Sequence, residues 1–166
     1  MNPHVFSLIQ TIFGGKRKVY EKRNVTEVNF YGLEFNVDYV INSNWQFNAN
    51  YTLNGSEISK FDDQPDLVNK TLSFVPSDLA NFSVSYLVNK IKANINIHYQ
   101  GKMFLDEANT FEVKPLVSLD ASVAYSFYKA FSIRLSAQNI LDEQHMVSSD
   151  QMSLGRYLSL ALRYGF

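Results

Sequence analysis

The 166-residue sequence has no cysteine, so disulfide scaffolds and thiolate metal sites are excluded. It is also poor in charge: Asp, Glu, Lys and Arg make up 19% of the residues, and the net charge is -1. A nucleic-acid-binding protein needs a basic face, which this balance does not supply. No uninterrupted apolar run approaches the ~18 residues of a membrane-spanning helix. A nucleic-acid partner and a helical membrane span are therefore not expected.

The start of the sequence also does not have the pattern of a secretory signal peptide. The first residues, MNPHVFSLIQTIFGG, have no basic n-region, and polar residues interrupt their apolar run. If the protein is exported, we expect its true start to lie upstream of Met1.

Catalytic and metal-ligating patterns are also missing. The three histidines, His4, His98 and His145, are scattered along the chain. The acidic group Asp62, Asp63 and Asp66 lacks the spacing and the glycine of a Ca²⁺-binding EF-hand loop. We therefore predict that the chain is not an enzyme and has no catalytic residue, cofactor site or metal site.

Aromatic residues and alternating side chains are abundant, and both meet in the last stretch, 155–166, which reads GRYLSLALRYGF. Side chains alternate between the two faces of a β-strand. One face of this strand would be apolar: Leu158, Leu160, Leu162, Tyr164 and Phe166. The other would be small or polar: Tyr157, Ser159, Ala161, Arg163 and Gly165. A strand of an outer-membrane barrel can end in this way, with its last aromatic residue at the membrane interface.

The same alternation recurs along the chain. It covers residues 30–41, 45–54, 81–88, 91–100, 117–127 and 131–138. With a short strand expected at 4–13, the pattern predicts about eight antiparallel strands and little or no helix. Short turns at 42–44, 89–90 and 128–130 alternate with long loops at 55–69, 101–114 and 141–154. Outer-membrane barrels combine short periplasmic turns with long extracellular loops in this way.

Alternation alone fits two kinds of barrel, because a soluble lipid-binding barrel has its apolar residues inside and a membrane barrel has them outside. The polar faces favour the membrane barrel, since they are rich in Ser, Asn, Gln and Thr and poor in Lys and Glu. We predict that their few charges face the lumen: Glu34, Asp38, Lys92, Asp120, Arg134 and Arg163. Aromatic residues cluster next to the short turns, as in an interfacial girdle: Tyr39, Trp45, Tyr86, Tyr125, Phe127, Phe131, Tyr164 and Phe166.

Several stretches resemble the C-terminal end of TonB-dependent receptors, the gated outer-membrane transporters of Gram-negative bacteria. Residues 138–143, QNILDE, resemble the penultimate-strand motif of that family, with Asn139 and Asp142 bracketing two apolar residues. Gly155 and Arg156 open a strand that resembles its closing strand. Residues 104–110, FLDEANT, resemble a loop of the family, and weaker matches lie at 32–34 and 76–81. The richness in Asn, Lys and Tyr resembles Bacteroidetes members.

The resemblance implies that the chain is the C-terminal part of a barrel of ~22 strands, with the signal peptide and the plug domain absent from residues 1–166. It implies a parent protein that works with TonB and imports a siderophore-iron complex, cobalamin or a glycan, with no cofactor. It also implies that Leu162, Tyr164 and Phe166 form a signal for the barrel-assembly machinery. The chain would contact outer-membrane lipid and end on the periplasmic side.

Two questions stay open from the sequence. A stand-alone eight-stranded barrel, acting as an anchor or adhesin, would have a similar length and strand count. Arg134 and Arg163 lie on the polar faces of neighbouring strands of the predicted hairpin, and we expect them to pair either with Asp120 on the adjacent strand or with a carboxylate of the plug.

Overall fold

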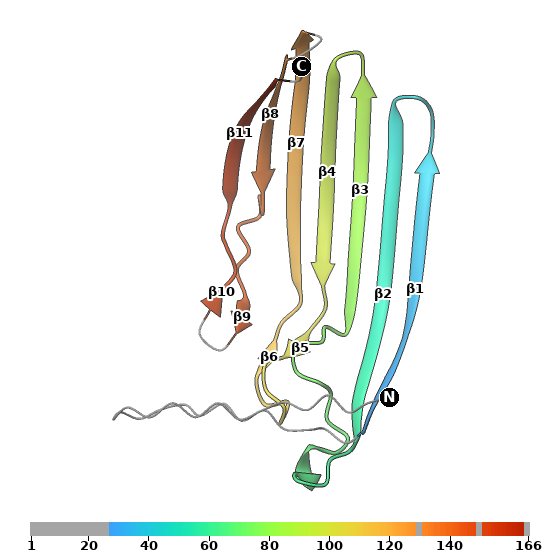
Figure 1. Ribbon diagram of the computed structural model, residues 1–166, viewed down its shortest axis with the longest axis vertical. Helices are drawn as coiled ribbons and strands as arrows, with labels where there is room; N and C mark the ends of the chain where they lie inside the picture. The colour runs from blue at the N-terminus through green and yellow to red at the C-terminus, as the bar shows by residue number, and fades with distance from the viewer. Residues whose placement is uncertain (1–26, 129–130, 149–150, 165–166) are drawn as a thin grey trace, which may run out of the picture.

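The computed structural model describes residues 27–128, 131–148 and 151–164. Its main feature is one antiparallel sheet of seven long strands, in the order β1-β2-β3-β4-β7-β8-β11 (Figure 1). The strands are β1 Glu27–Val40, β2 Trp45–Lys60, β3 Asp78–Val88, β4 Ile91–Gln100, β7 Leu116–Tyr128, β8 Phe131–Gln138 and β11 Tyr157–Tyr164. The predicted all-β antiparallel fold is confirmed. The expected strand at 4–13 lies outside the described residues.

The long connections lie at one end of the sheet and contain small elements of their own (Figure 1). These are a single 3₁₀ turn, η1 Pro65–Leu67, and two short hairpins, β5 Met103–Phe104 with β6 Glu112–Val113, and β9 Met146–Ser148 with β10 Gln151–Met152. The short turns at 41–44 and 89–90 lie at the opposite end. The two ends of the sheet therefore differ, because one carries the short turns and the other carries the long loops.

The predicted loop at 55–69 begins too early, because β2 continues to Lys60. Its last part pairs with the start of β1, where Gly55 lies opposite Tyr31 and Ile58 opposite Val28. The backbones of β1 and β2 therefore stay paired beyond Leu53, although the apolar side chains of β2 no longer keep to one face there. Leu53 is on the apolar face, whereas Ile58 is on the other face and is buried.

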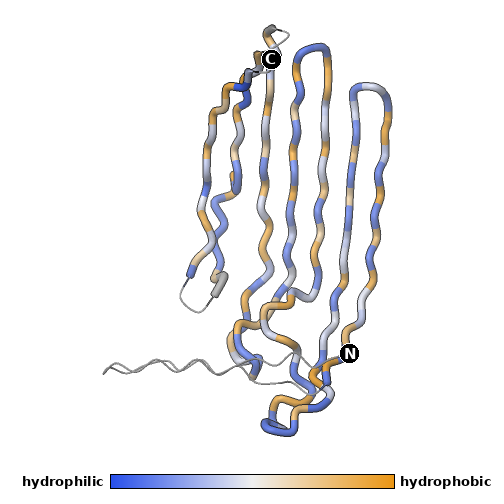
Figure 2. The backbone as a smooth tube through the Cα atoms, viewed as in Figure 1, coloured by the Kyte–Doolittle hydropathy of each residue, from blue (hydrophilic) through white to orange (hydrophobic). Residues whose placement is uncertain are grey.

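Register across the sheet aligns the apolar side chains on a single face. Cross-strand partners on this face include Leu33 with Leu53, Phe47 with Val84, Ile95 with Ala121, and Leu135 with Leu160. The alternation is visible along each long strand in Figure 2. Most of these side chains are exposed, and Leu160 keeps 70% of its surface accessible. A continuous exposed apolar face of this kind is what a lipid-facing barrel wall presents.

The buried core is small and lies at the long-loop end. Its hydrophobic members are Ile58, Phe61, Leu67, Met103 and Val113. Ile58, Phe61 and Leu67 form one cluster, against which Val28, Val68 and Leu72 pack. The core therefore stabilises the connections, while the long strands are held mainly by their backbone pairing.

Aromatic rings gather near the short-turn end. Trp45 packs on Tyr86 with ring centroids 4.4 Å apart, and Phe131 packs on Tyr164 at 4.6 Å. Phe127 joins the second group at 5.8 Å from Phe131. Rings at this height can lie at the level of lipid headgroups while their neighbours contact hydrocarbon.

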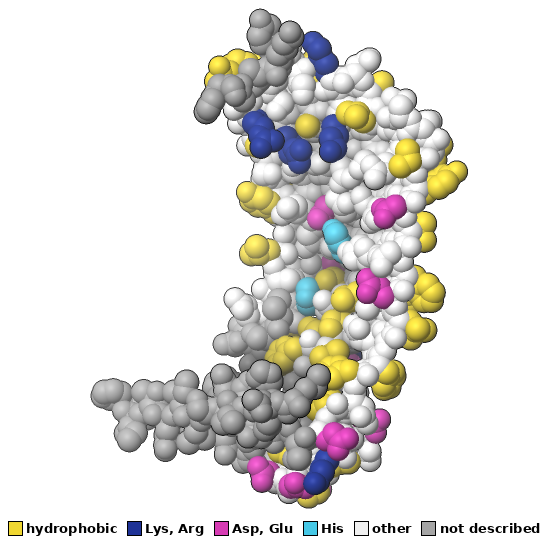
Figure 3. All heavy atoms as spheres, turned by 45° about the vertical axis from the view of Figure 1, so that its right-hand side comes forward, with side chains coloured by type: hydrophobic (Ala, Val, Ile, Leu, Met, Phe, Trp, Pro, Cys, Tyr) yellow, Lys and Arg dark blue, Asp and Glu magenta, His cyan; other side chains and the backbone are white. Residues whose placement is uncertain are grey.

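The sheet is curved and open. The face seen in Figure 3 is hollowed and carries charged side chains, while hydrophobic side chains project along its outer edge. β1 and β11 stand at the two ends of the strand order, and no pairing joins them in the described ranges. An eight-stranded barrel closed on itself is therefore not what these residues form.

Candidate functional site

The hollowed face is lined by amide, hydroxyl and a few charged side chains, and its centre holds a chain of polar contacts. Asn81 donates to Asn50 at 2.9 Å and also contacts Nδ1 of His98. Nε2 of His98 lies 3.5 Å from the carboxylate of Asp120. Asp120 in turn accepts a hydrogen bond of 2.9 Å from the backbone N–H of Asn139. The contacts link β2, β3, β4 and β7 to the end of β8.

The six charged residues predicted to face a lumen all lie on this polar face by register. Glu34 and Asp38 lie on β1, where Asn36 donates to Glu34 at 3.0 Å and Asn48 of β2 donates to Asp38. That this face borders a lumen remains a prediction for these residues. The acidic groups on β1 lie at the far side of the sheet from the cations on β8 and β11.

The expected pairing of Arg134 and Arg163 with Asp120 is wrong. Arg134 lies opposite Ala124, which is four positions along β7 from Asp120. That separation is roughly 13 Å along a strand. Asp120 is occupied instead by His98 and by the Asn139 backbone. The other alternative, a plug carboxylate, stays a prediction.

The motif residues Asn139, Asp142, Gly155 and Arg156 meet at the junction between β8 and β11. The side chain of Asn139 donates to the carbonyl oxygens of Glu143 at 2.7 Å and Leu154 at 3.1 Å, and it accepts from the Glu143 N–H at 3.1 Å. Asp142 accepts from the Arg156 N–H at 2.7 Å. The network closes the connection that leads into the last strand.

Backbone conformation explains the residue types at this junction. Asn139 and Asp142 have φ values of 47° and 58°, a region that Asn and Asp tolerate better than most residues. A Cβ on Gly155 would lie 2.8 Å from Oδ1 of Asp142, so any side chain there would disturb the bond to Arg156. The motif therefore has a structural role, which residue spacing alone did not reveal.

We expect Asn139→Ala to destabilise this junction by roughly 2 kcal/mol, because it removes three hydrogen bonds and disfavours the positive φ. Asn139→Gly removes the same bonds and keeps the backbone conformation, so it should cost less. Amide hydrogen exchange at Glu143 and Arg156 in the full-length protein would measure the loss. Equal protection in Asn139→Ala and the unchanged protein would contradict this role.

The loop motif at 104–110 is held by a second network. Asp106 accepts from the hydroxyl of Thr110 at 2.7 Å, from the Thr110 N–H at 3.0 Å and from the Phe111 N–H at 2.7 Å. The Asn109 amide accepts from the Thr71 N–H and donates to the Thr71 carbonyl, both at 2.8 Å. Two long connections that are far apart in the sequence are thus joined at the same end of the sheet.

The pKa of Asp106 is lowered. Desolvation alone would raise it, but the hydrogen bonds from Thr110 and Phe111 favour the carboxylate and outweigh it. Since the folded pKa lies below the reference value of 3.8, the carboxylate stabilises the loop above that pH. The contribution should disappear as the pH falls through the folded pKa.

We therefore expect the amide of Phe111 to lose protection from hydrogen exchange only below about pH 4. Asp106→Asn keeps an acceptor oxygen and removes the charge, so its protection should be weaker and should not change over this pH range. A loop that opened between pH 5 and 7 would contradict this assignment.

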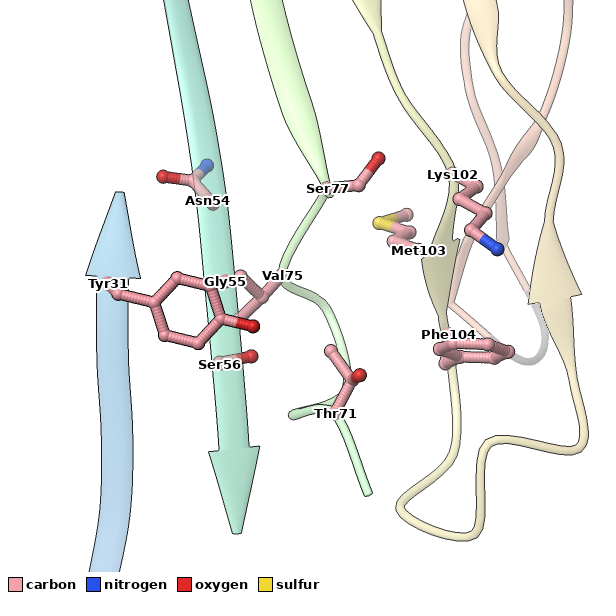
Figure 4. A pocket seen from close by; sticks show the side chains of 10 residues that line it. All are labelled: Tyr31, Asn54, Gly55, Ser56, Thr71, Val75, Ser77, Lys102, Met103 and Phe104. Carbon is pink, nitrogen blue, oxygen red and sulfur yellow. The ribbon is translucent and has the colours of Figure 1, made fainter. Parts of the chain in front are cut away.

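A pocket of about 150 Å³ opens between the ends of β1 and β2 and the β5 segment (Figure 4). The ring of Tyr31 lies across Gly55, where an added Cβ would collide with it. Lys102 lines the pocket and lies 3.6 Å from Glu112. The volume is below the ~300 Å³ of typical small-molecule sites, so this pocket suits a few waters or a small part of a ligand.

A larger hollow of about 440 Å³ lies between residues 111–116 and 143–146. His145 lines it, and its buried Nδ1 has no hydrogen-bond partner among the residues described. Among all the residues that the structure describes, no three His, Cys, Asp or Glu side chains are grouped so that they could hold a metal ion.

No helix in the described part of the chain is long and apolar enough to cross a membrane.

Two residues of the predicted assembly signal, Leu162 and Tyr164, lie at the end of β11. Leu162 is 69% exposed and Tyr164 packs on Phe131, both on the apolar face. Phe166 lies outside the described residues. Recognition of this strand by the barrel-assembly machinery remains a prediction.

Solved receptor structures share this arrangement of strands. The siderophore receptor PiuA from Acinetobacter baumannii matches with a TM-score of 0.74 and 23% identity, over 82% of this chain and 22% of that one. The ferric yersiniabactin uptake receptor FyuA from Yersinia pestis matches with a TM-score of 0.75 and 19% identity, over 84% and 24%. This chain therefore spans about a quarter of their length or less, and identities this low show the fold alone. No curated protein matches the sequence.

A family model supplies the assignment. The model described as "TonB dependent receptor-like, beta-barrel" matches residues 4–140. The family and the structural neighbours are outer-membrane receptors and transporters, not enzymes. With the open antiparallel sheet and its exposed apolar face, this match shows that the chain belongs to the TonB-dependent receptor family and forms part of its β-barrel.

Proposed function

We propose that the chain is the C-terminal part of the barrel wall of a receptor that imports a scarce nutrient across the outer membrane, with energy supplied through TonB. The observation that carries this proposal is the distribution of side chains on the sheet. One face is continuously apolar and exposed, and the hollowed face bears amides, hydroxyls and charges. Such a wall separates lipid from a polar interior while every strand pairs with its neighbour.

The long connections would lie outside the cell and help to capture the ligand, and the C-terminus would lie on the periplasmic side. A siderophore-iron complex is the first candidate substrate, because PiuA and FyuA are described as siderophore and ferric yersiniabactin receptors. Cobalamin and glycans are the other candidates. The plug domain and the segment that contacts TonB would belong to the rest of the parent protein.

Uptake by the full-length receptor tests this proposal. The complete reading frame would be expressed in a Gram-negative host and supplied with radiolabelled iron-siderophore complexes, cobalamin or oligosaccharides. We expect one class to accumulate, and we expect accumulation to stop in a matched strain without TonB. Uptake that continues without TonB, or a reading frame that encodes only a small barrel, would contradict it.

The alternative of a stand-alone anchor or adhesin finds no support in the sheet. β1 and β11 remain edges in the described ranges, and unpaired strand edges are costly in lipid.

A further inference from the structure

The hollow of about 440 Å³ between residues 111–116 and 143–146 lies at the long-connection end of the sheet. We call it the His145 pocket. One wall belongs to the connection between β4 and β7, and the other belongs to the connection between β8 and β11. Small-molecule sites have volumes of roughly 300–1,000 Å³, so this pocket is large enough for a ring-sized part of a ligand.

Hydrogen bonds from two separate networks fix the walls of the His145 pocket. In the first wall, the backbone N–H of Phe111 donates to Asp106 at 2.7 Å. In the second wall, the side chain of Asn139 holds the backbone of Glu143 through bonds of 2.7 and 3.1 Å. Both networks therefore end at the same pocket. A site whose walls are already in place loses less conformational freedom when a ligand binds.

The ring of His145 brings an unsatisfied nitrogen to this pocket. Its Nδ1 is buried and has no hydrogen-bond partner among the described residues. A buried polar atom without a partner is costly. Nδ1 donates or accepts according to the tautomer of the ring, whereas a hydroxyl group can do either. A ligand hydroxyl would therefore satisfy this nitrogen in both tautomers.

The rest of the lining combines an aromatic surface with groups that bind hydroxyls. Phe111 lines the pocket and is 49% exposed. The side chains of Glu143 and Gln144 have no hydrogen-bond partner in the described part of the chain, so their oxygens are free to accept from hydroxyls. A sugar ring has hydroxyls on its rim and C–H groups on its faces, and such a face can pack on an aromatic ring.

The charges around the pocket favour an uncharged ligand. Glu112 lies 3.6 Å from Lys102, which leaves Glu143 and Lys114 as lining charges of opposite sign. Figure 3 shows further acidic side chains at this end of the molecule. Iron(III) complexes of catecholate or carboxylate chelators carry a net negative charge, and this end of the chain offers no excess of positive charge to attract them.

We propose that the His145 pocket binds a sugar ring, so that a glycan is the ligand captured by the long connections, and this inference rests on the proposed function. The face of the ring packs on Phe111. Its hydroxyls bond to Nδ1 of His145 and to the side chains of Glu143 and Gln144. The likeness to PiuA and FyuA does not oppose a glycan, because identities of 23% and 19% show the fold alone.

Equilibrium binding to the purified full-length receptor tests this inference. The probes are neutral oligosaccharides of glucose, xylose, mannose and galactose, compared with a ferric tris-catecholate. We expect an oligosaccharide to bind with an affinity that stays constant up to about 0.5 M salt, because no charge pair is involved. Phe111→Ala and His145→Phe should each weaken this binding roughly tenfold, since the first removes the packing ring and the second removes the hydrogen-bonding nitrogen but keeps a ring.

Two further variants separate a binding defect from a folding defect. Phe74→Ala is the matched control, since Phe74 is a 52% exposed aromatic residue of the long connections and does not line the pocket. It should bind the oligosaccharide as the unchanged receptor does. Phe111→Tyr keeps an aromatic ring and should recover most of the affinity that Phe111→Ala loses. The heat-dependent gel shift of each purified variant would show that its barrel is folded.

The possible outcomes distinguish this inference from the proposed function. A panel in which no oligosaccharide binds, or equal affinities in Phe111→Ala, His145→Phe and Phe74→Ala, would overturn the sugar site. Binding of the ferric tris-catecholate that is lost in Phe111→Ala would also overturn it, by assigning the pocket to an anionic iron complex, and would leave the proposed function standing. An oligosaccharide that needs the pocket for binding but does not accumulate through TonB would support the sugar site and count against the proposed function.

Discussion

Leu135→Arg is expected to lower the stability of the folded receptor in lipid by about 2–4 kcal/mol, the cost of an arginine at the middle of a barrel's lipid face. Leu135 is 53% exposed and lies on the apolar face, between Val123 and Leu160. It is roughly 13 Å along β8 from Phe131, which places it near the centre of an apolar band about 25 Å tall. Arginine there has no polar partner and must reach the interface or thin the bilayer.

The adjacent residue provides the matched control. Ser136 is on the hollowed face, opposite Ser122 and Ser159, so Ser136→Arg should be accommodated with an effect near zero. Urea titration of the full-length protein in lipid vesicles, followed by the heat-dependent gel shift of folded barrels, would measure both variants. Equal effects of the two substitutions would mean that the apolar face does not contact lipid.

Gly32→Val should have the second large effect, because the close approach of β1 and β2 leaves no room for a side chain. Gly32 lies opposite Asn54, and a Cβ at this position would collide with the backbone carbonyl oxygen of Leu53. A backbone oxygen in a paired strand cannot move aside as a flexible side chain can. We expect Gly32→Val to lower the free energy of unfolding by at least about 1–3 kcal/mol and to separate the two strands of the hairpin near this position.

Hydrogen exchange in the β1–β2 hairpin of the full-length protein would detect this separation. The expected pattern is faster exchange near Gly32 and Leu53, with β8 and β11 unchanged. Asn36→Val, on the same face of β1, is the control, since Asn36 loses only an exposed hydrogen bond to Glu34. Comparable exchange in both variants would show that the collision at Gly32 is relieved at little cost.

Alternation of side chains predicted most of the sheet, and the physical reason is local. Residues from Tyr31 to Val40 and from Trp45 to Leu53 switch between apolar and polar with a period of two, which only a strand with one face in an apolar medium requires. The same period set which side chains lie together on each face, and the Asn-rich composition of residues 42–44 marked a short turn. The prediction failed at 55–60. There the apolar side chain of Ile58 lies on the face opposite to Leu53, and the pairing with β1 continues although the alternation of apolar and polar residues has ended.

The contacts between connections could not be predicted in this way, because no period links residues that are far apart in the chain. Asn109 bonds to the backbone of Thr71 only because hairpin pairing brings their two connections to one end of the sheet. Asn139 bonds to the carbonyl of Leu154 only because the pairing of β8 with β11 brings together the two ends of one connection. These contacts show what the motif residues do locally, whereas the sequence could show only that the motif was present.

The sequence by itself determined that this chain is a β-structure with one apolar face and one polar face, since both follow from neighbouring residues on each strand. Only the tertiary structure decided which polar residues meet across strands. It separated Arg134 from Asp120 and joined Asp120 to His98. It also brought Lys92 to the same pocket as Arg134 by register on Ala124. Register is a property of paired strands, and no single strand encodes it.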